Sequence, residues 1–444
     1  MSNELVAKLL SEHPQYTKNK STWRYMLESY LGGDVYRKGA HLTKYSLETD
    51  SSYEARLRAT PLDNHCQSVI SVYNSFLFRE PAKRTFNNLN EADVNPFLAD
   101  ADFDGRTLNN YMKDVASWSS VFGHTWSLLV KPNTNAKTRA DELAQEVRPY
   151  INLLTPLSVL DWEWKRQPNG LYVLVYLKYI EERSGNNITI KEWTTDMIRT
   201  AEIDIEEDEV LNDLIEDNEL AKIPAVIAYN RRSNNRGIGI SDITDIADAQ
   251  KFIYNMNSEI EQGVRLESHP SLVKTEDTKA GTGAGSVIHM PDDMDPALKP
   301  FMLDFNGASV ASVLSAIEKT VKAIDTMANT GAVRATEVST LSGVAMQTEF
   351  QLLNARLSEK ADNLELAEEQ IWRLFALYQD KAFDGTIEYP GSFNITDTQN
   401  EFAQLVSAKG AATDPAVFAV IDNKLVELLG EEPEQVFDNN DENI

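Results

Sequence analysis

The stretch that decides the fold begins at residue 239 and reads GISDITDIADAQKFIYNMNSEIEQGVRL to residue 266. Ser241 is a good helix N-cap, and Asp242 and Asp245 would lie in the first turn, where the helix dipole stabilises acidic side chains. The apolar residues that follow recur every three or four positions, as one face of a helix requires: Ile243, Ile246, Ala249, Phe252, Ile253, Met256 and Ile260. The pattern predicts a helical rod on the order of 38 Å long.

A second helix of the same kind is predicted at residues 308–328, after an insert of short strands and loops at 267–307. The next segment, NTGAVRATEVSTL at 329–341, is small and polar and predicts a loop. From Ser342 to about Gln379 the three-and-four spacing of apolar residues returns, which predicts a rod of roughly 57 Å. One small core cannot cover so long a helix, so we expect it to pack against several elements or against other subunits.

The residues before 239 mix helices and strands. Helices are predicted near residues 23–30, 61–78 and 107–121, and the last of them leads through Gly123 into a strand at 125–131. Residues 150–203 contain short strands separated by Gly and Asn turns, which predicts an antiparallel meander. Residues 202–219 hold ten acidic side chains and no Lys or Arg, and we interpret them as a solvated run that ends the meander.

The C-terminal part predicts one more helix and an acidic tail. Asp414 and Pro415 are a helix start, and Gly430 is its stop. Residues 431–444 carry six acidic residues and no base. We expect this tail to be frayed or disordered, because like charges at that density repel one another.

The composition of the chain disfavours several classes of function. The chain has 444 residues, with 42 Lys and Arg against 69 Asp and Glu, and a formal net charge of −27. Wrapping nucleic acid requires clustered Lys and Arg, so that mode of binding is disfavoured. The single cysteine, Cys66, excludes an intrachain disulfide. No stretch approaches the about 20 apolar residues of a membrane span, and residues 1–20 lack the core of a signal peptide. We expect a cytosolic protein, or one assembled from cytosolic subunits.

Two acidic groups raise the possibility of a metal site. Asp242, Asp245 and Asp248 resemble the carboxylates of a metal–diphosphate helix, but one helix cannot place them around one metal. First-turn acids on a solvated face are the favoured interpretation. Asp292, Asp293 and Asp295 form a compact acidic turn with oxygen ligands that suit calcium or magnesium. Their spacing is not that of an EF-hand, and an ordinary proline-flanked turn is favoured.

No other group of residues has the arrangement of a catalytic or cofactor site. Gly281, Gly283 and Gly285 lack the Lys and the following helix of a phosphate-binding loop. Neighbouring His65 and Cys66 would point apart on a helix, so Cys66 is expected to be a buried free thiol. His124 lies between aromatic residues and is expected to be packed in the core. We therefore expect no enzyme and no cofactor.

The order of these parts resembles that of portal proteins of tailed double-stranded-DNA bacteriophages. Three passages carry the resemblance: the run IPAVIAYN at 223–230, the helix opening GISDI at 239–243, and the segment from Gly331 to Gly343. It implies an α+β portal fold whose parts, in this numbering, are a wing (1–238, with the meander at 150–203), stem helices (239–266 and 308–328), a clip (267–307), a tunnel loop (329–341), a long wing helix and return (342–394), and a crown with acidic tail (395–444).

The resemblance also implies a function. Similar proteins form rings of about twelve subunits at the capsid vertex of the virion, after assembly in the bacterial cytoplasm, and viral DNA passes through the ring during packaging and ejection. The implied partners are the terminase large subunit, the major capsid protein and the head-completion or tail adaptor. In the tunnel loop, the residues implied to meet DNA are Asn329, Thr330, Arg334, Thr336 and Glu337. In the clip, the residues implied to meet the adaptor or a neighbouring subunit are Val273, Val287, Ile288, Asp292, Asp293 and Asp295.

Two other classes of function stay open at this stage. One is a cytosolic helical metal-dependent enzyme that uses Asp242 and Asp245, or Asp292, Asp293 and Asp295. The other is a different virion or scaffold component that uses long helices for assembly. Metal-dependent turnover would favour the enzyme, and the mass in solution separates a ring from the other two.

Overall fold

The computed structural model describes residues 2–132, 139–145, 147–268, 271–276, 279–280, 288–290, 293, 295, 298–303, 308–334, 343–393, 405–410 and 415–428. The chain divides into two compact units, Met1–Gly391 and Ser392–Ile444. In the second unit, α14 (Pro415–Leu428) confirms the predicted C-terminal helix and begins at its proline. Residues 405–410 of the second unit are also helical. The elements named below belong to the first unit.

The helices of the N-terminal part begin and end at capping residues. Thr107 caps α7 through its side chain, and Gly123 ends α7 in the left-handed conformation, with φ of 90°. The predicted helix at 61–78 begins later, at His65, because the Asn64 side chain accepts a hydrogen bond from the Gln67 amide. The helices here are α1 (Ser2–Leu9), α2 (Pro14–Leu31), α3 (Gly33–Lys38), α4 (Asp50–Ala59), α5 (His65–Leu77), α6 (Glu91–Ala99), α7 (Leu108–Phe122) and α8 (Arg139–Ala144).

A three-stranded antiparallel sheet lies at the centre of the first unit. Its middle strand is β2 (His124–Val130), with β3 (Tyr150–Leu154) on one side and β9 (Ala225–Tyr229) on the other. β2 is almost wholly buried, and α7 packs against it. Two further strands, β1 (Lys83–Phe86) and β14 (Gly385–Glu388), pair with each other although they lie far apart in the sequence. This pair was not predicted from the sequence.

The predicted meander is a five-stranded antiparallel sheet in simple sequence order. Its strands are β4 (Val159–Arg166), β5 (Tyr172–Ser184), β6 (Asn187–Thr194), β7 (Met197–Asp204) and β8 (Glu209–Asp217). The interpretation of residues 202–219 as a solvated run is confirmed, because β8, which lies within it, is exposed along almost its whole length. Its pairing with β7 as a fifth strand was not predicted. Backbone pairing tolerates the acidic side chains since they remain solvated, and Arg199 on β7 pairs with Asp213 at 2.7 Å.

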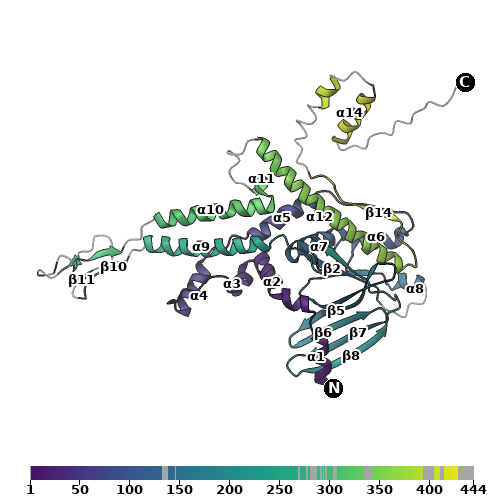
Figure 1. Cartoon of the computed structure of the whole chain (residues 1–444), viewed down its shortest axis with the longest axis horizontal. Helices are drawn as coiled ribbons and strands as arrows, with labels where there is room; N and C mark the ends of the chain where they lie inside the picture. The colour runs from purple at the N-terminus through teal and green to yellow at the C-terminus, as the bar shows by residue number, and fades with distance from the viewer. Residues whose placement is uncertain are drawn as a thin grey trace. The chain divides into compact units, whose positions relative to one another are not determined.

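Two long antiparallel helices, α9 (Thr244–Ser268) and α10 (Ala308–Ala328), lie side by side (Figure 1). Short strand pairs follow at their far ends: β10 (Ser271–Val273) with β13 (Phe301–Leu303), and β11 (Lys279–Ala280) with β12 (Ile288–His289). α9 begins three residues after the predicted cap, because Ser241 bonds the Ile243 amide ahead of the helix.

The long helix predicted from Ser342 is confirmed as α12 (Gly343–Leu377), which packs against β9. The segment predicted as a loop begins instead with a short helix, α11 (Gly331–Arg334). No described helix combines the length and the apolar character that a membrane span needs.

Candidate functional site

A buried polar cluster around Asp242 joins four segments of the chain. The Asp242 side chain is only 1% exposed, and it accepts hydrogen bonds from Asn230 at the end of β9 and from Arg356 and Lys360 on α12. Lys360 also donates to the Ser120 hydroxyl on α7 at 2.9 Å. The residues that open α9 are therefore fixed to a strand, to a core helix and to the long helix α12 at one point.

The charges of this cluster compensate one another. Burial alone would raise the pKa of Asp242, but the charges of Lys360 and Arg356 beside it lower that pKa to about 2. Desolvation lowers the pKa of Lys360, and the Asp242 carboxylate opposes that effect. A buried carboxylate is tolerated only when it is paired and hydrogen-bonded, as Asp242 is here. The interpretation of Asp242 as a first-turn acid on a solvated face was therefore wrong.

Two glycines allow the backbone to cross closely beside this cluster. A Cβ atom on Gly239 would lie 1.9 Å from the Gly123 carbonyl oxygen, and Gly123 itself has a φ of +90°. The Asn230 amide donates to that same carbonyl at 2.9 Å. His124, which is fully buried, accepts from the Gly239 amide through Nδ1, which confirms it as a packed histidine. A side chain larger than hydrogen cannot be placed at either glycine.

A second set of contacts continues from the cluster to the end of α10. The Tyr73 ring on α5 lies under the cations of Arg356 and Lys360, at 5.5 and 5.1 Å, and its hydroxyl donates to the Ala328 carbonyl at 2.6 Å. Arg334 on α11 pairs with Asp325 on α10 at 2.9 Å. The start of α9 and the end of α10 are thus anchored to α5 and α12.

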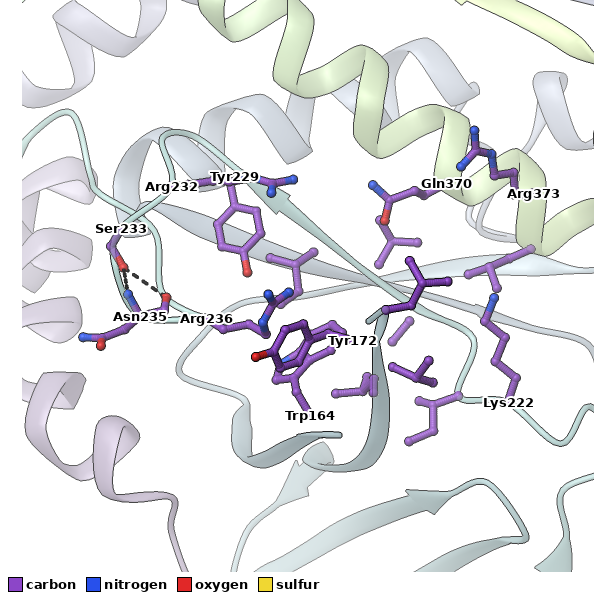
Figure 2. Close-up of a pocket in the computed structure, with 18 of the residues that line it drawn as sticks. Trp164, Tyr172, Lys222, Tyr229, Arg232, Ser233, Asn235, Arg236, Gln370 and Arg373 are labelled. Atoms are coloured by element: carbon purple, nitrogen blue, oxygen red, sulfur yellow. Dashed lines mark hydrogen bonds between the residues drawn. The ribbon is translucent and has the colours of Figure 1, made fainter. Parts of the chain in front are cut away.

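A basic pocket of about 610 Å³ lies between β9, the beginning of β5, the loop at 230–239 and α12 (Figure 2). Figure 2 shows Arg232 and Arg236 at one end and Lys222 and Arg373 at the other. No Asp or Glu is among the described residues that line it. Desolvation, and then the charge of Arg373, lower the pKa of Lys222, so these two cations lie close enough to repel.

Neither the partners of Asp242 nor the basic pocket was predicted from the sequence. One signal was present: Lys360 follows Leu357 by three residues and precedes Leu364 by four, so it lies on the apolar face of α12. A lysine on a buried face requires a carboxylate partner, although the sequence does not say which one. The pocket has no such signal, since its cations come from three separated segments.

A family model of phage portal proteins, described as SPP1 Gp6-like, matches residues 13–408. The chain belongs to this phage portal protein family. Portal proteins are structural, and membership supports a structural role over an enzymatic one. No curated protein has a matching sequence.

Chains from three solved structures of gene transfer agent particles are similar to this portal chain at low identity. In the virion of the native particle, identity is 10% and the TM-score 0.47, covering 90% of this chain and 98% of that chain. In the neck of the empty particle with C6 symmetry, identity is 11% and the TM-score 0.48, covering 91% of this chain and 100% of that chain. In the neck of the native particle with C12 symmetry, identity is 10% and the TM-score 0.47, covering 92% of this chain and 99% of that chain.

The segment predicted as a tunnel loop, 329–341, is described up to residue 334, and this part is tied into the rest of the chain. Asn329 has a φ of 55°, and Thr330 is fully buried. The Arg334 side chain, 11% exposed, bonds His65 Nδ1 at 2.8 Å as well as Asp325. Thr336 and Glu337 lie outside the described residues. In this arrangement Thr330 offers no side-chain surface to DNA, and the contact of this loop with DNA stays a prediction.

The residues predicted to act in a clip are only partly described. Val273 is 40% exposed and pairs with Phe301, and Ile288 pairs with Ala280 within the same chain. Asp293 and Asp295 are exposed. Val287 and Asp292 lie outside the described residues, as do Gly281, Gly283 and Gly285.

The acidic groups considered as metal sites have different surroundings. The Asp242 carboxylate already accepts hydrogen bonds from Lys360 and Arg356, whereas Asp245 is exposed. Within the part of the chain that the structure describes, no group of three or more His, Cys, Asp or Glu side chains is arranged to hold a metal ion. Cys66 is buried and free, as predicted.

Proposed function

We propose that this portal chain forms a ring of about twelve subunits at the capsid vertex of a virion, through which viral double-stranded DNA enters and leaves. The match to the portal family over residues 13–408 carries the proposal. The proposed parts are the wing (1–238 and 342–394), the stem (239–266 and 308–328), the clip (267–307), the tunnel loop (329–341) and the crown (395–444).

The surface of the proposed stem supports self-association. Phe252 and Val264 on α9, and Leu314 and Met327 on α10, are each at least 40% exposed on helices that already pack against one another. Apolar residues left exposed on a long helix pair are typical of subunit interfaces. A closed ring also requires that each subunit present two different contact surfaces, and a two-helix stem has two faces to offer.

The proposed channel needs walls that do not hold DNA tightly. A formal charge of −27 for each subunit repels a polyanion, and a small number of cations can still guide it. We further propose that the ring docks the terminase large subunit and the major capsid protein. The clip, with Asp292, Asp293 and Asp295 near its lip, would later receive the adaptor.

The proposal is tested first by the mass and shape of the purified chain. Native mass spectrometry should give one oligomer near twelve subunits, and negative-stain images should show rings with a central hole. A stable monomer at all concentrations would contradict the proposal. A deletion within residues 335–341 should leave rings intact and impair DNA packaging, and normal packaging by that variant would argue against the tunnel-loop assignment.

A further inference from the structure

Three of the four cations of the basic pocket have no ion-pair partner within the described part of the chain. Lys222, Arg232 and Arg236 form no ion pair with any carboxylate of the described residues. Among the described residues, Arg373 pairs with Glu369, one helical turn earlier on α12, at 2.6 Å. In a chain with 69 acidic residues against 42 basic ones, a concave surface whose charged lining residues, among those described, are all cations favours an external anion.

The aromatic side chains of the pocket are already covered by guanidinium groups. Arg236 lies 3.9 Å from the centre of the Tyr172 ring and 5.7 Å from that of Trp164. Arg232 lies 5.3 Å from the centre of the Tyr229 ring. These contacts hold the guanidinium groups in place and leave their N–H donors for an incoming acceptor.

One wall of the pocket is the free edge of β9. The Pro224 carbonyl accepts from Leu129 and the Asn230 amide donates to Gly123, so the even-numbered residues of β9 face β2. The backbone groups of Ile227 and Tyr229 then face away from β2, and they have no hydrogen-bond partner among the described residues. An unpaired strand edge accepts another strand.

The pocket lies along that edge and not over one face of the sheet. Ala225, Val226 and Ile227 all line it, although consecutive residues of a strand point to opposite faces. The opposite wall is also a strand edge: Tyr172 and Leu174 of β5 pair with β4, but β5 pairs with β6 only from Tyr176 onward. The pocket is therefore a slot between two strand edges.

We propose that this slot binds an extended acidic peptide segment of another protein, which adds as a strand to the edge of β9. Its backbone would pair with Ile227 and Tyr229, and its carboxylates would meet Arg232 and Arg236 at one end and Lys222 and Arg373 at the other. Backbone pairing supplies affinity, and the cations select an acidic sequence. This partner site goes beyond the proposed ring and channel.

Single-stranded nucleic acid is the other polyanion to consider. It binds proteins through basic grooves with free aromatic faces on which bases stack. Here the guanidinium groups already occupy the rings of Tyr172, Trp164 and Tyr229. A strand edge also has no role in that mode of binding, so the peptide is favoured.

The binding test uses the purified full-length protein and a fluorescein-labelled ten-residue peptide in which glutamate alternates with valine and threonine. Fluorescence anisotropy should show saturable binding of this peptide. The same peptide with lysine in place of glutamate should not bind. A version N-methylated at alternate amides should bind at least about tenfold more weakly, because it cannot pair with an edge.

Variants assign that binding to the slot. The double variant Arg232→Glu with Arg236→Glu should weaken binding about tenfold or more, since it removes two charge-assisted donors. Arg58→Glu, a charge reversal at an exposed arginine on α4, is the matched control and should bind normally. Circular dichroism of each variant checks the fold.

Three outcomes would overturn the proposal. The first is the absence of saturable binding of the acidic peptide, and the second is equal binding by the double variant and the wild type. The third is binding of a ten-nucleotide oligothymidylate that the double variant loses, without competition from the peptide, which would assign the slot to nucleic acid.

Discussion

At the scale of single residues, Asp242 depends on the cations that surround it. Lys360→Met would leave a fully buried carboxylate with only Arg356 and Asn230 as partners. Breaking a buried ion pair by removing one member costs about 3–5 kcal/mol, so this variant should unfold at markedly lower urea concentration. Urea unfolding followed by tryptophan fluorescence measures the change.

A double variant that also changes Asp242 is the control for that experiment. Asp242→Asn combined with Lys360→Met removes both of the most deeply buried charges and should recover part of the lost stability, because the remaining cation, Arg356, is 16% exposed and can be partly solvated. Lys18→Met, at an exposed position on α2, should leave the unfolding curve unchanged. Equal stability of Lys360→Met and the wild type would show that the cluster is not a buried ion pair.

His124 sets a pH dependence with a definite sign. Burial lowers its pKa from 6.5 to about 3, so the folded chain keeps it neutral while the unfolded chain gains a proton. The buried neutral His124 therefore costs no stability above about pH 6.5. Below that pH the free energy of unfolding falls by about 1.4 kcal/mol for each pH unit, down to about pH 3. His124→Phe keeps an aromatic ring and removes the titration.

The melting temperature should therefore fall less steeply between pH 6.5 and pH 4 in His124→Phe than in the wild type. The variant also loses the acceptor for the Gly239 amide, which lowers stability at every pH without changing the slope. Asp242 does not interfere, because its contribution is present above about pH 4 and is lost only toward pH 2. Parallel curves would contradict the assignment to His124.

At the scale of elements, periodicity and caps were sufficient for the helices. α7, α12 and α14 lie within a few residues of their predicted bounds, since apolar spacing and capping are local properties of sequence. β8 was missed because its acidic residues dominate its sequence pattern over its four apolar residues, whereas its pairing with β7 is a backbone property. The β1–β14 pair joins Thr85 to Thr386, and no local pattern connects such distant residues.

The candidate sites were less predictable than the elements, for the same reason. Asp242 was noticed, but its partners Asn230, Arg356 and Lys360 come from elements that only the tertiary fold brings together. The basic pocket draws on β5, β9, the following loop and α12. Sequence periodicity places a residue on a face of its own element and does not say which other element that face meets.

The crossing of the segments at Gly123 and Gly239 is an element-scale constraint that can be tested directly. Gly239→Ala would place a methyl group 1.9 Å from the Gly123 carbonyl oxygen, so the strand and the loop must separate. The expected loss is several kcal/mol, about that of other severe backbone clashes or overpacked core sites. Gly391→Ala, where a Cβ atom meets nothing within 4 Å, is the control and should have little effect on the melting temperature.

At the scale of the whole molecule, the proposed ring requires the exposed apolar residues of α9 and α10 to be buried between subunits. Leu314 is 46% exposed and Phe252 43% exposed, so the isolated subunit leaves nearly half of each residue uncovered. Burying such side chains contributes about 25 cal/mol per Å² of apolar surface, repeated at every interface of a ring. A charge placed there would oppose assembly without unfolding the subunit.

Leu314→Asp combined with Phe252→Asp should therefore convert the oligomer into folded monomers. Analytical ultracentrifugation measures the mass, and circular dichroism shows whether the helices persist. Leu47→Asp is the matched control, because Leu47 is 96% exposed and lies outside the helix pair, so its oligomer should be unchanged. An intact ring in the double variant would place the subunit interface elsewhere, while loss of the helical signal would assign Leu314 and Phe252 to folding of the subunit itself.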